Sequence, residues 1–294
     1  MMHRNFIYLM IGLFAALGCS SCSSTAKEAE KPLITVTIEP LRYFTEAIAG
    51  DYFEVTSMVP KGSSPETYDP TPHQLVDLHK SKAYLRIGYI GFERSWIEKL
   101  KANATEVAFY DTSEGVDLIH SSGHWHGDHF HAENVEPHIW NSTKNAQIMA
   151  DNICKALSEI DKEHQAFFQS RTDSLKQVIR QTDEEIKAIL KEADKTFLIY
   201  HPALSYFARD YGLNQISIEK EGKEPSPSYL KSLIVTCKEE QAHVIFVQQE
   251  FDTKNAQIIA DEIGVEVISI NPLSYEWQAE MKRIAQSLQT KERK

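Results

Sequence analysis

Histidines are concentrated in one short stretch, HSSGHWHGDHFHAENVEPHIW, which runs from His120 to Trp140. Neutral imidazole is a common protein ligand for zinc and neighbouring transition metals. Most of these histidines are mixed with glycine and acidic residues, a composition typical of a flexible, metal-attracting loop. They are His120, His124, His126, His129 and His131. A polar surface loop with no metal role is the alternative interpretation.

His138 differs from the other histidines in its surroundings. It is followed by Ile139 and Trp140, and these apolar neighbours indicate an ordered, partly buried position. A lone buried histidine is more often a hydrogen-bonded core residue than a metal ligand. His138 is therefore a candidate ligand only if other donors converge on it.

Composition and charge narrow the class of protein. The chain has 294 residues, enough for one large domain or two smaller ones, and a hydrophobic fraction of 42%, which suits a globular core. Its formal net charge is −11. Binding to a nucleic-acid backbone needs concentrated Lys and Arg, so we expect no nucleic-acid partner. A net negative charge suits a soluble protein that meets cations.

The N-terminus has the features of a targeting segment. An apolar run from Phe6 to Leu17 follows a basic start and is too short to span a bilayer, but it fits a signal peptide. Small residues leading into Cys19 resemble a bacterial lipoprotein signal, in which the cysteine is lipidated after cleavage. Cys22 is a second candidate, and an ordinary cleaved signal is the alternative. We expect a signal peptide and lipid tether over residues 1–31, with attachment to the membrane by lipid only.

The two cysteines outside this segment, Cys154 and Cys237, lie far apart in the sequence. They could pair in an oxidising compartment or remain as free buried thiols, and the sequence leaves both possibilities open. No CxxC spacing typical of thiolate zinc sites occurs beyond the signal region.

Apolar runs alternate with helical patterns along the rest of the chain. Strands are expected at residues 33–38, 52–59, 83–88 and 106–110, and again at 196–200, 215–218, 243–247 and 265–270. Such alternation predicts mainly parallel sheets flanked by helices. Residues 142–192 contain neither Gly nor Pro and predict a long helix. The expected fold is α/β, with two lobes, each containing a four-stranded sheet, joined by one long rigid helix.

The corresponding domain boundaries follow from these elements. The N-terminal lobe is expected over residues 32–141, including the His-rich loop at 120–131. The linking helix covers residues 142–192 and the C-terminal lobe residues 193–294.

Candidate metal ligands follow several of the predicted strands. In parallel α/β sheets, ligands bind beyond the carboxyl ends of the strands. Glu66 lies in the loop after the second strand, His138 follows the fourth, and His201 directly ends the first strand of the second half. Two imidazoles and a carboxylate are a reasonable ligand set for Zn²⁺, completed by water or a fourth side chain. Asn271 and Glu250, which also follow strands, are weaker candidates.

Four motifs resemble one family of proteins. They are SSPETYDPTP, EPHIWNSTKNA, HPALSYFARDYGL and IFVQQEFDTKNAQIIADEIG. Their types and order resemble the metal-binding solute-binding proteins of ABC transporters, which are the extracytoplasmic receptors of zinc and manganese importers. The resemblance covers nearly all of the chain after the tether. It implies two lobes, a rigid linking helix and one transition-metal ion between the lobes, with a His-rich loop beside the site in the zinc branch.

The resemblance carries over to individual residues unevenly. His138 and His201 match ligand positions of the family. Glu66 stands where a ligand histidine is usual, and Asn271 stands where many members have a ligand aspartate. A carboxylate in place of an imidazole favours manganese or iron, whereas the His-rich loop favours zinc, which we rank first.

The expected function is therefore high-affinity capture of Zn²⁺ in the periplasm and its delivery to an ABC permease. The protein is expected to be a monomeric lipoprotein attached to a cell membrane, and not an enzyme. A manganese or iron receptor of the same family is the nearest alternative. A zinc hydrolase with Glu66 or Glu250 as base is a further one, although no HExxH motif is present. The last is an adhesin that uses the metal only structurally.

Overall fold

The computed structural model describes residues 31–289 except 122–123, 127–128, 132–133 and 220–222, and it describes no side chains between residues 121 and 134. The predicted signal peptide, tether and lipidated Cys19 lie outside the described residues. None of the described helices combines the length and the apolarity that crossing a bilayer requires.

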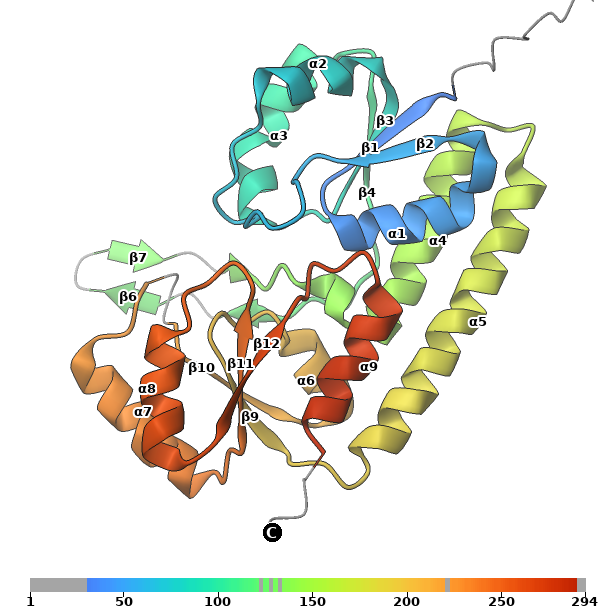
Figure 1. Ribbon diagram of the computed structural model, residues 1–294. Coiled ribbons are helices and arrows are strands. Elements are labelled where there is room, and N and C mark those ends of the chain that lie inside the picture. Colours follow the sequence, from blue (N-terminus) through green and yellow to red (C-terminus); the bar gives the residue numbers. More distant parts are fainter. Residues whose placement is uncertain (1–30, 122–123, 127–128, 132–133, 220–222, 290–294) are drawn as a thin grey trace, which may run out of the picture. The chain divides into compact units, whose positions relative to one another are not determined.

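The first sheet is built from short apolar segments near the start of the chain. Its four strands are all parallel and have the order β2-β1-β3-β4 (Figure 1). The strands are β1 (Leu33–Val36), β2 (Glu54–Ser57), β3 (Ser81–Arg86) and β4 (Ala108–Asp111). The connecting helices are α1 (Glu39–Ala49), α2 (Pro72–Lys80) and α3 (Gly91–Asn103), and the 3-10 turn η1 (Gly50–Tyr52) follows α1.

The second sheet repeats this topology. Its four parallel strands have the order β10-β9-β11-β12. They are β9 (Thr196–Ile199), β10 (Asn214–Ser217), β11 (Val244–Gln248) and β12 (Glu266–Ile270). The accompanying helices are α6 (Ser205–Tyr211), α7 (Pro227–Glu239), α8 (Lys254–Ile263) and α9 (Trp277–Ser287). The prediction of two lobes with four-stranded parallel sheets is confirmed.

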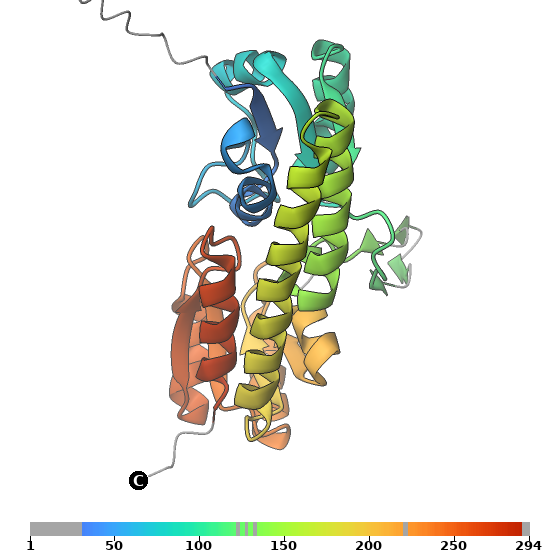
Figure 2. The ribbon, with the colours of Figure 1, turned by 90° about the vertical axis from the view of Figure 1, so that its right-hand side faces the viewer.

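The segment between the lobes differs from the prediction of one continuous helix. It contains α4 (Thr143–Ile160) and α5 (Gln165–Leu190), which run side by side (Figures 1 and 2). At the break, the Asp161 carboxylate accepts hydrogen bonds from the His164 backbone N–H at 3.3 Å and from its ring at 2.7 Å. These local contacts hold the turn between the two helices, which forms without Gly or Pro.

Helix α5 takes the linking role that the sequence assigned to the whole segment. It packs against α1 of the first lobe, against α9 of the second and against α4. Its buried face includes Phe168, Leu175, Ile179 and Ile186. With 26 residues at ~1.5 Å rise each, it extends for about 39 Å along both lobes.

A buried aromatic cluster fills the contact between the lobes. Phe44 of α1 meets Trp277 of α9 edge-on, with ring centroids 5.1 Å apart. The Trp277 indole donates to the Trp140 carbonyl at 2.8 Å, and the Trp140 indole donates to the Pro272 carbonyl at 2.8 Å. All three aromatic side chains are buried, so the two lobes share one apolar core.

The His-rich segment forms short antiparallel pairs. Strand β5 (His120–Ser121) pairs with β8 (Asn134–Val135), and β6 (His124–His126) pairs with β7 (His129–His131). His120 is exposed. The side chains of His124, His126, His129 and His131 lie outside the described residues, so their metal role stays a prediction.

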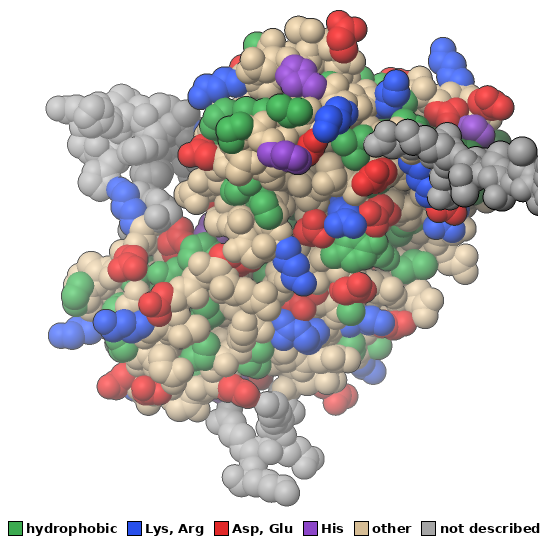
Figure 3. All heavy atoms as spheres, turned by 45° about the horizontal axis from the view of Figure 1, so that its top comes forward, with side chains coloured by type: hydrophobic (Ala, Val, Ile, Leu, Met, Phe, Trp, Pro, Cys, Tyr) green, Lys and Arg blue, Asp and Glu red, His purple; other side chains and the backbone are tan. Residues whose placement is uncertain are grey.

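Charged side chains of both signs lie on the surface of the molecule (Figure 3). On the face shown in Figure 3, the described Lys and Arg side chains are interspersed with Asp and Glu, without a broad basic patch.

One acidic side chain is completely buried in the first lobe. Glu93 of α3 accepts hydrogen bonds from the Thr37 hydroxyl and from the backbone N–H groups of Ile87, at 2.8 Å, and Gly88. Burial raises the pKa of Glu93 to about 7, although these hydrogen bonds oppose the shift. The folded state thus holds a proton that the unfolded chain loses near its ordinary pKa of 4.5.

We predict that this group makes the lobe less stable as pH rises from about 5 to 7, because only the unfolded chain then gains by ionising. Glu93→Gln cannot ionise, so it serves as the reference whose stability does not depend on this titration. Relative to this variant, the unchanged protein should lose up to ~3 kcal/mol of unfolding free energy across that range. Urea unfolding of both metal-free proteins at several pH values measures the difference, and parallel stability curves would contradict the prediction.

Candidate metal centre

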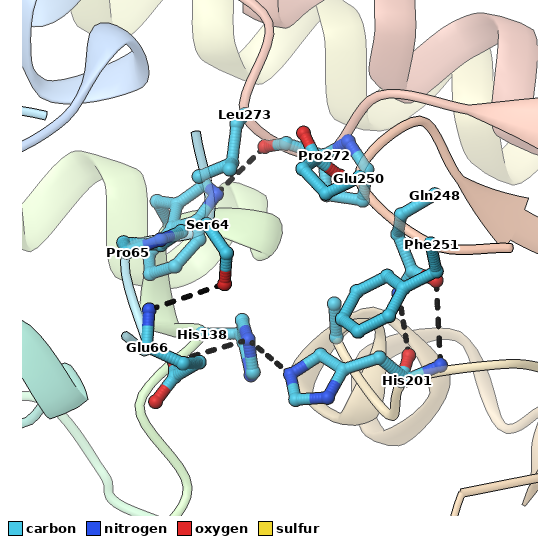
Figure 4. Close-up of a pocket in the computed structure, with 12 residues that line it drawn as sticks. Ser64, Pro65, Glu66, His138, His201, Gln248, Glu250, Phe251, Pro272 and Leu273 are labelled. Carbon is cyan, nitrogen blue, oxygen red and sulfur yellow. Dashed lines mark hydrogen bonds and ion pairs between the residues drawn. The ribbon is translucent and has the colours of Figure 1, made fainter. Parts of the chain in front are cut away.

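Glu66, His138 and His201 converge at the contact between the two lobes (Figure 4). Each offers one ligand atom, and these atoms all lie within 4.8 Å of one another. The Nε2 atoms of His138 and His201 are 3.2 Å apart, and His138 Nε2 is 4.0 Å from Glu66 Oε1. Two nitrogens bound to one tetrahedral Zn²⁺ are about 3.3 Å apart. The two imidazoles are therefore spaced to share one ion.

The start of helix α3 positions the Glu66 carboxylate. Glu66 Oε2 accepts a hydrogen bond from the backbone N–H of Gly91 at 3.2 Å, and the Phe92 N–H donates to the Pro65 carbonyl at 2.9 Å. Helix N-termini attract negatively charged groups, so this contact holds the carboxylate in place.

The other oxygen of this carboxylate, Glu66 Oε1, is buried and has no hydrogen-bond partner among the described residues. An unpartnered buried polar atom is costly, and this one lies on the side of the two imidazoles. A cation shared with the imidazoles would satisfy it, so the donor set fits a divalent transition metal.

The loop that carries Glu66 is fastened where it enters helix α2. Thr71 and Gln74 form a reciprocal capping box at the start of this helix. The Gln74 side chain also donates to the Met58 carbonyl at 2.6 Å and accepts from the Tyr68 hydroxyl at 2.6 Å. These contacts tie the loop to the end of β2, which limits the freedom of Glu66.

His138 is held by a neighbouring carboxylate. Glu136 Oε1 contacts its Nδ1 and accepts from its backbone N–H at 3.1 Å, while Ser205 from the second lobe donates to Glu136 Oε2 at 3.3 Å. His138 is only 5% exposed and precedes the 3-10 turn η2 (Ile139–Asn141). A carboxylate on Nδ1 fixes the ring so that Nε2 faces the other ligands.

The charges around this pair shift two pKa values. Burial lowers the pKa of His138, but the nearby carboxylates, Glu136 foremost, raise it by more than burial lowers it, so the net shift is upward. Burial likewise raises the pKa of Glu136, but His138 outweighs it, so the pKa of Glu136 is lowered. Both directions show that the pair favours an ionised carboxylate beside the imidazole.

His201 has an equivalent arrangement in the second lobe. Its Nδ1 lies 3.1 Å from Glu219 Oε2, and the Phe251 ring stacks on it with centroids 5.4 Å apart. Each imidazole thus has a carboxylate on its outer nitrogen and directs its inner nitrogen to the pocket, an arrangement that recurs in metal sites.

Sequence reasoning missed both outer carboxylates. Glu136 had a local signal, because it precedes His138 by two positions in the EPHIW motif. For Glu219, the only signal in the sequence is its position shortly after the strand β10.

The weaker ligand candidates lie differently. Glu250 lines the pocket, and burial raises its pKa, but it is not part of the group of three ligands. Asn271 stabilises the turn after β12, where its Oδ1 accepts from the Leu273 N–H at 3.2 Å and its own N–H donates to Glu280 at 2.7 Å. Leu273, and not Asn271, is among the residues that line the pocket.

The two cysteines of the described residues do not pair. Cys154 and Cys237 are both free and buried. Burial also raises the pKa of Cys237 to about 11, which leaves it as a neutral thiol. Of the two possibilities left open by the sequence, the free thiols are therefore observed.

A family model matches almost the whole described chain. It is the model for ZnuA, the periplasmic component A of the zinc-uptake complex, and it matches residues 34–291. The chain belongs to this family. A crystal structure of ZnuA is similar over 88% of this chain and 98% of its own, with 36% identity and a TM-score of 0.81.

Curated relatives carry the names of two metals. The high-affinity zinc uptake system protein ZnuA of Bacillus subtilis is 26% identical over 89% of this chain and 85% of its own length. The manganese ABC transporter substrate-binding lipoprotein PsaA of Streptococcus pneumoniae is 26% identical over 90% of this chain and 86% of its own.

The family relation establishes the general activity. Members are metal-binding receptors for the ABC uptake of zinc or manganese, and they work with a permease. They are solute-binding proteins and not enzymes, so the resemblance noted from the four motifs is confirmed and the hydrolase alternative is wrong.

The contact between Glu66 and Gly91 leads to a prediction. A Cβ at position 91 would lie 2.5 Å from the Glu66 carbonyl oxygen and 2.7 Å from Oε2, so Gly91→Ala must displace the carboxylate. We expect zinc affinity to fall about 10- to 100-fold, as when supporting residues of metal sites are lost. Competition with a chromophoric chelator measures this.

Lys101→Ala serves as the control. Lys101 is an exposed residue near the other end of α3, so its substitution should leave zinc affinity unchanged. Equal affinities for Gly91→Ala and the unchanged protein would show that the carboxylate position does not matter for binding.

Proposed function

We propose that this protein captures Zn²⁺ outside the cytoplasm with Glu66, His138 and His201 and delivers it to an ABC permease. The observation that carries the proposal is the convergence of three ligand atoms within 4.8 Å around a buried, unpartnered carboxylate oxygen. The family relation supports both the uptake of a metal and the permease as partner.

The ligand chemistry supports zinc as the metal. Two imidazole nitrogens and one carboxylate oxygen suit four-coordinate Zn²⁺, with water or another donor in the fourth position. One oxygen of Glu66 is already held by the Gly91 N–H, which favours binding through the other oxygen alone and a low coordination number. Manganese prefers more oxygen donors, and at a mixed N/O site its affinity ranks below that of zinc. The single carboxylate is the feature that would favour manganese or iron.

Outer-sphere carboxylates support tight capture. Glu136 and Glu219 each contact the outer nitrogen of a ligand imidazole, which increases the basicity of the ligand and fixes its tautomer. A bound Zn²⁺ would be surrounded by three carboxylates and two neutral imidazoles. The ion thus supplies positive charge among these three carboxylates.

The remaining parts of the proposal concern location. Lipidation at Cys19 would tether the receptor to a cell membrane. The receptor would work in the periplasm, as a monomer. The lipoprotein names of relatives such as PsaA support the lipid tether. The histidines at 120, 124, 126, 129 and 131 would collect zinc weakly and raise its concentration beside the tight site.

The ligand assignment is tested with His138→Ala and His201→Ala. Each removes one of three protein ligands, so we expect zinc affinity measured by chelator competition to fall at least ~100-fold, since even supporting residues cost 10- to 100-fold. His79→Ala, which removes an exposed histidine of α2, is the control and should bind like the unchanged protein. If both ligand variants keep full affinity, the site is elsewhere.

The role of the His-rich segment is tested by deleting residues 120–131. The three proposed ligands remain, so we expect the tight site to keep its affinity while additional weak binding disappears and capture slows. Zinc titration calorimetry and stopped-flow measurements report these effects. Loss of all tight binding would mean that the segment supplies the main ligands.

A further inference from the structure

Gln248 stands at the point where the second sheet ends beside His201. It is the last residue of β11, a strand that is buried along its whole length, and it is only 3% exposed. A buried polar side chain needs hydrogen-bond partners. Gln248 finds both of its partners on the backbone of His201.

The hydrogen bonds between the Gln248 side chain and the His201 backbone lie just beyond the paired part of β9 and β11. Leu198 and Ile199 of β9 pair with Ile245 and Phe246 of β11, and the Tyr200 N–H still donates to the Phe246 carbonyl at 2.9 Å. Continued past Ile199, this register would pair Tyr200 with Val247 and then His201 with Gln248, but the named strand β9 ends at Ile199.

At this position the Gln248 side-chain amide takes the place of the backbone hydrogen bonds between the two strands. Its Oε1 accepts from the His201 N–H at 3.3 Å, and its Nε2 donates to the His201 carbonyl at 2.5 Å. A side-chain amide suits this position because it carries an acceptor oxygen and a donor nitrogen side by side. A carboxylate would face the His201 carbonyl without a proton, and an apolar side chain would leave both backbone groups without this partner.

The same turn also holds the imidazole. The Phe251 N–H donates to the Gln248 carbonyl at 3.1 Å, which closes a tight turn after β11. The turn brings the Phe251 ring onto the His201 ring, with an interplanar angle of 15°. The turn therefore contacts His201 twice: Gln248 hydrogen-bonds to its backbone, and Phe251 stacks on its ring (Figure 4).

We propose that Gln248 is a positioning residue of the metal centre, whose amide fixes the backbone of His201 so that Nε2 points at the ion. This inference rests on the proposed function. Gln248 itself does not contact the metal. Without it, the turn that leaves β9 can rotate, and the 3.2 Å spacing between the two imidazole nitrogens is lost.

The test compares Gln248→Met, which keeps the length but loses both hydrogen bonds, with the unchanged protein. We expect zinc affinity in chelator competition to fall 10- to 100-fold. X-ray absorption at the zinc edge should show two imidazole ligands in the unchanged protein and fewer in the variant. A purely structural role of Gln248 would leave that ligand count unchanged.

A matched control separates positioning from general stability. The Asn152 amide also bridges two backbone carbonyls, those of Thr112 and Glu114, at 2.9 and 2.8 Å, but does not line the metal pocket. Asn152→Leu should lower the melting temperature of the metal-free protein and leave zinc affinity unchanged. If Gln248→Met does not fold, Gln248→Asn, whose shorter amide cannot span both backbone groups, should show the same loss of affinity.

The outcomes distinguish the two hypotheses. Tight zinc binding by the unchanged protein together with full affinity in the folded Gln248 variants would overturn the positioning role alone. Equal losses of affinity in Asn152→Leu and Gln248→Met would also overturn it. Absence of tight zinc binding in the unchanged protein would overturn the proposed function and this inference together.

Discussion

Two imidazole nitrogens from separate lobes lie 3.2 Å apart beside a carboxylate oxygen that has no hydrogen-bond partner among the described residues. Bringing three such groups together without a ligand is unfavourable, because each gives up water and gains little in return. The fold must therefore supply the free energy that keeps them close. It does so through the apolar core shared by the lobes, where Phe44, Trp140 and Trp277 are fully or almost fully buried.

The supports of the three ligands differ in kind but have the same effect. Glu66 depends on a helix N-terminus and on a glycine that lets the loop approach closely. His138 depends on Glu136, and His201 depends on Glu219, Phe251 and the Gln248 amide. Each ligand is thus fixed by groups of its own lobe or a short connecting segment, and the interface only sets the distance between them.

The sequence predicted the local part of this arrangement well. The alternation of strands and helices was sufficient to predict two parallel sheets, and the residues after the strands included all three converging groups. The break after α4 was missed because the turn contains neither Gly nor Pro and is held by a local contact between Asp161 and His164. Glu219 and Gln248 were missed because their roles depend on pairing between strands that are far apart in the chain. Such contacts are set by tertiary structure, and a single sequence contains no local signal for them.

The length and packing of α5 have a mechanical consequence. A helix that contacts α1 and α9 at once acts as a strut, because bending it would break backbone hydrogen bonds in its interior. A continuous helix packed on both lobes resists large rotations of one lobe relative to the other. Loading and unloading should therefore rely on small displacements of the turns that bear Glu66 and Phe251. A permease that releases the metal from this receptor would need to displace those turns rather than separate the two lobes.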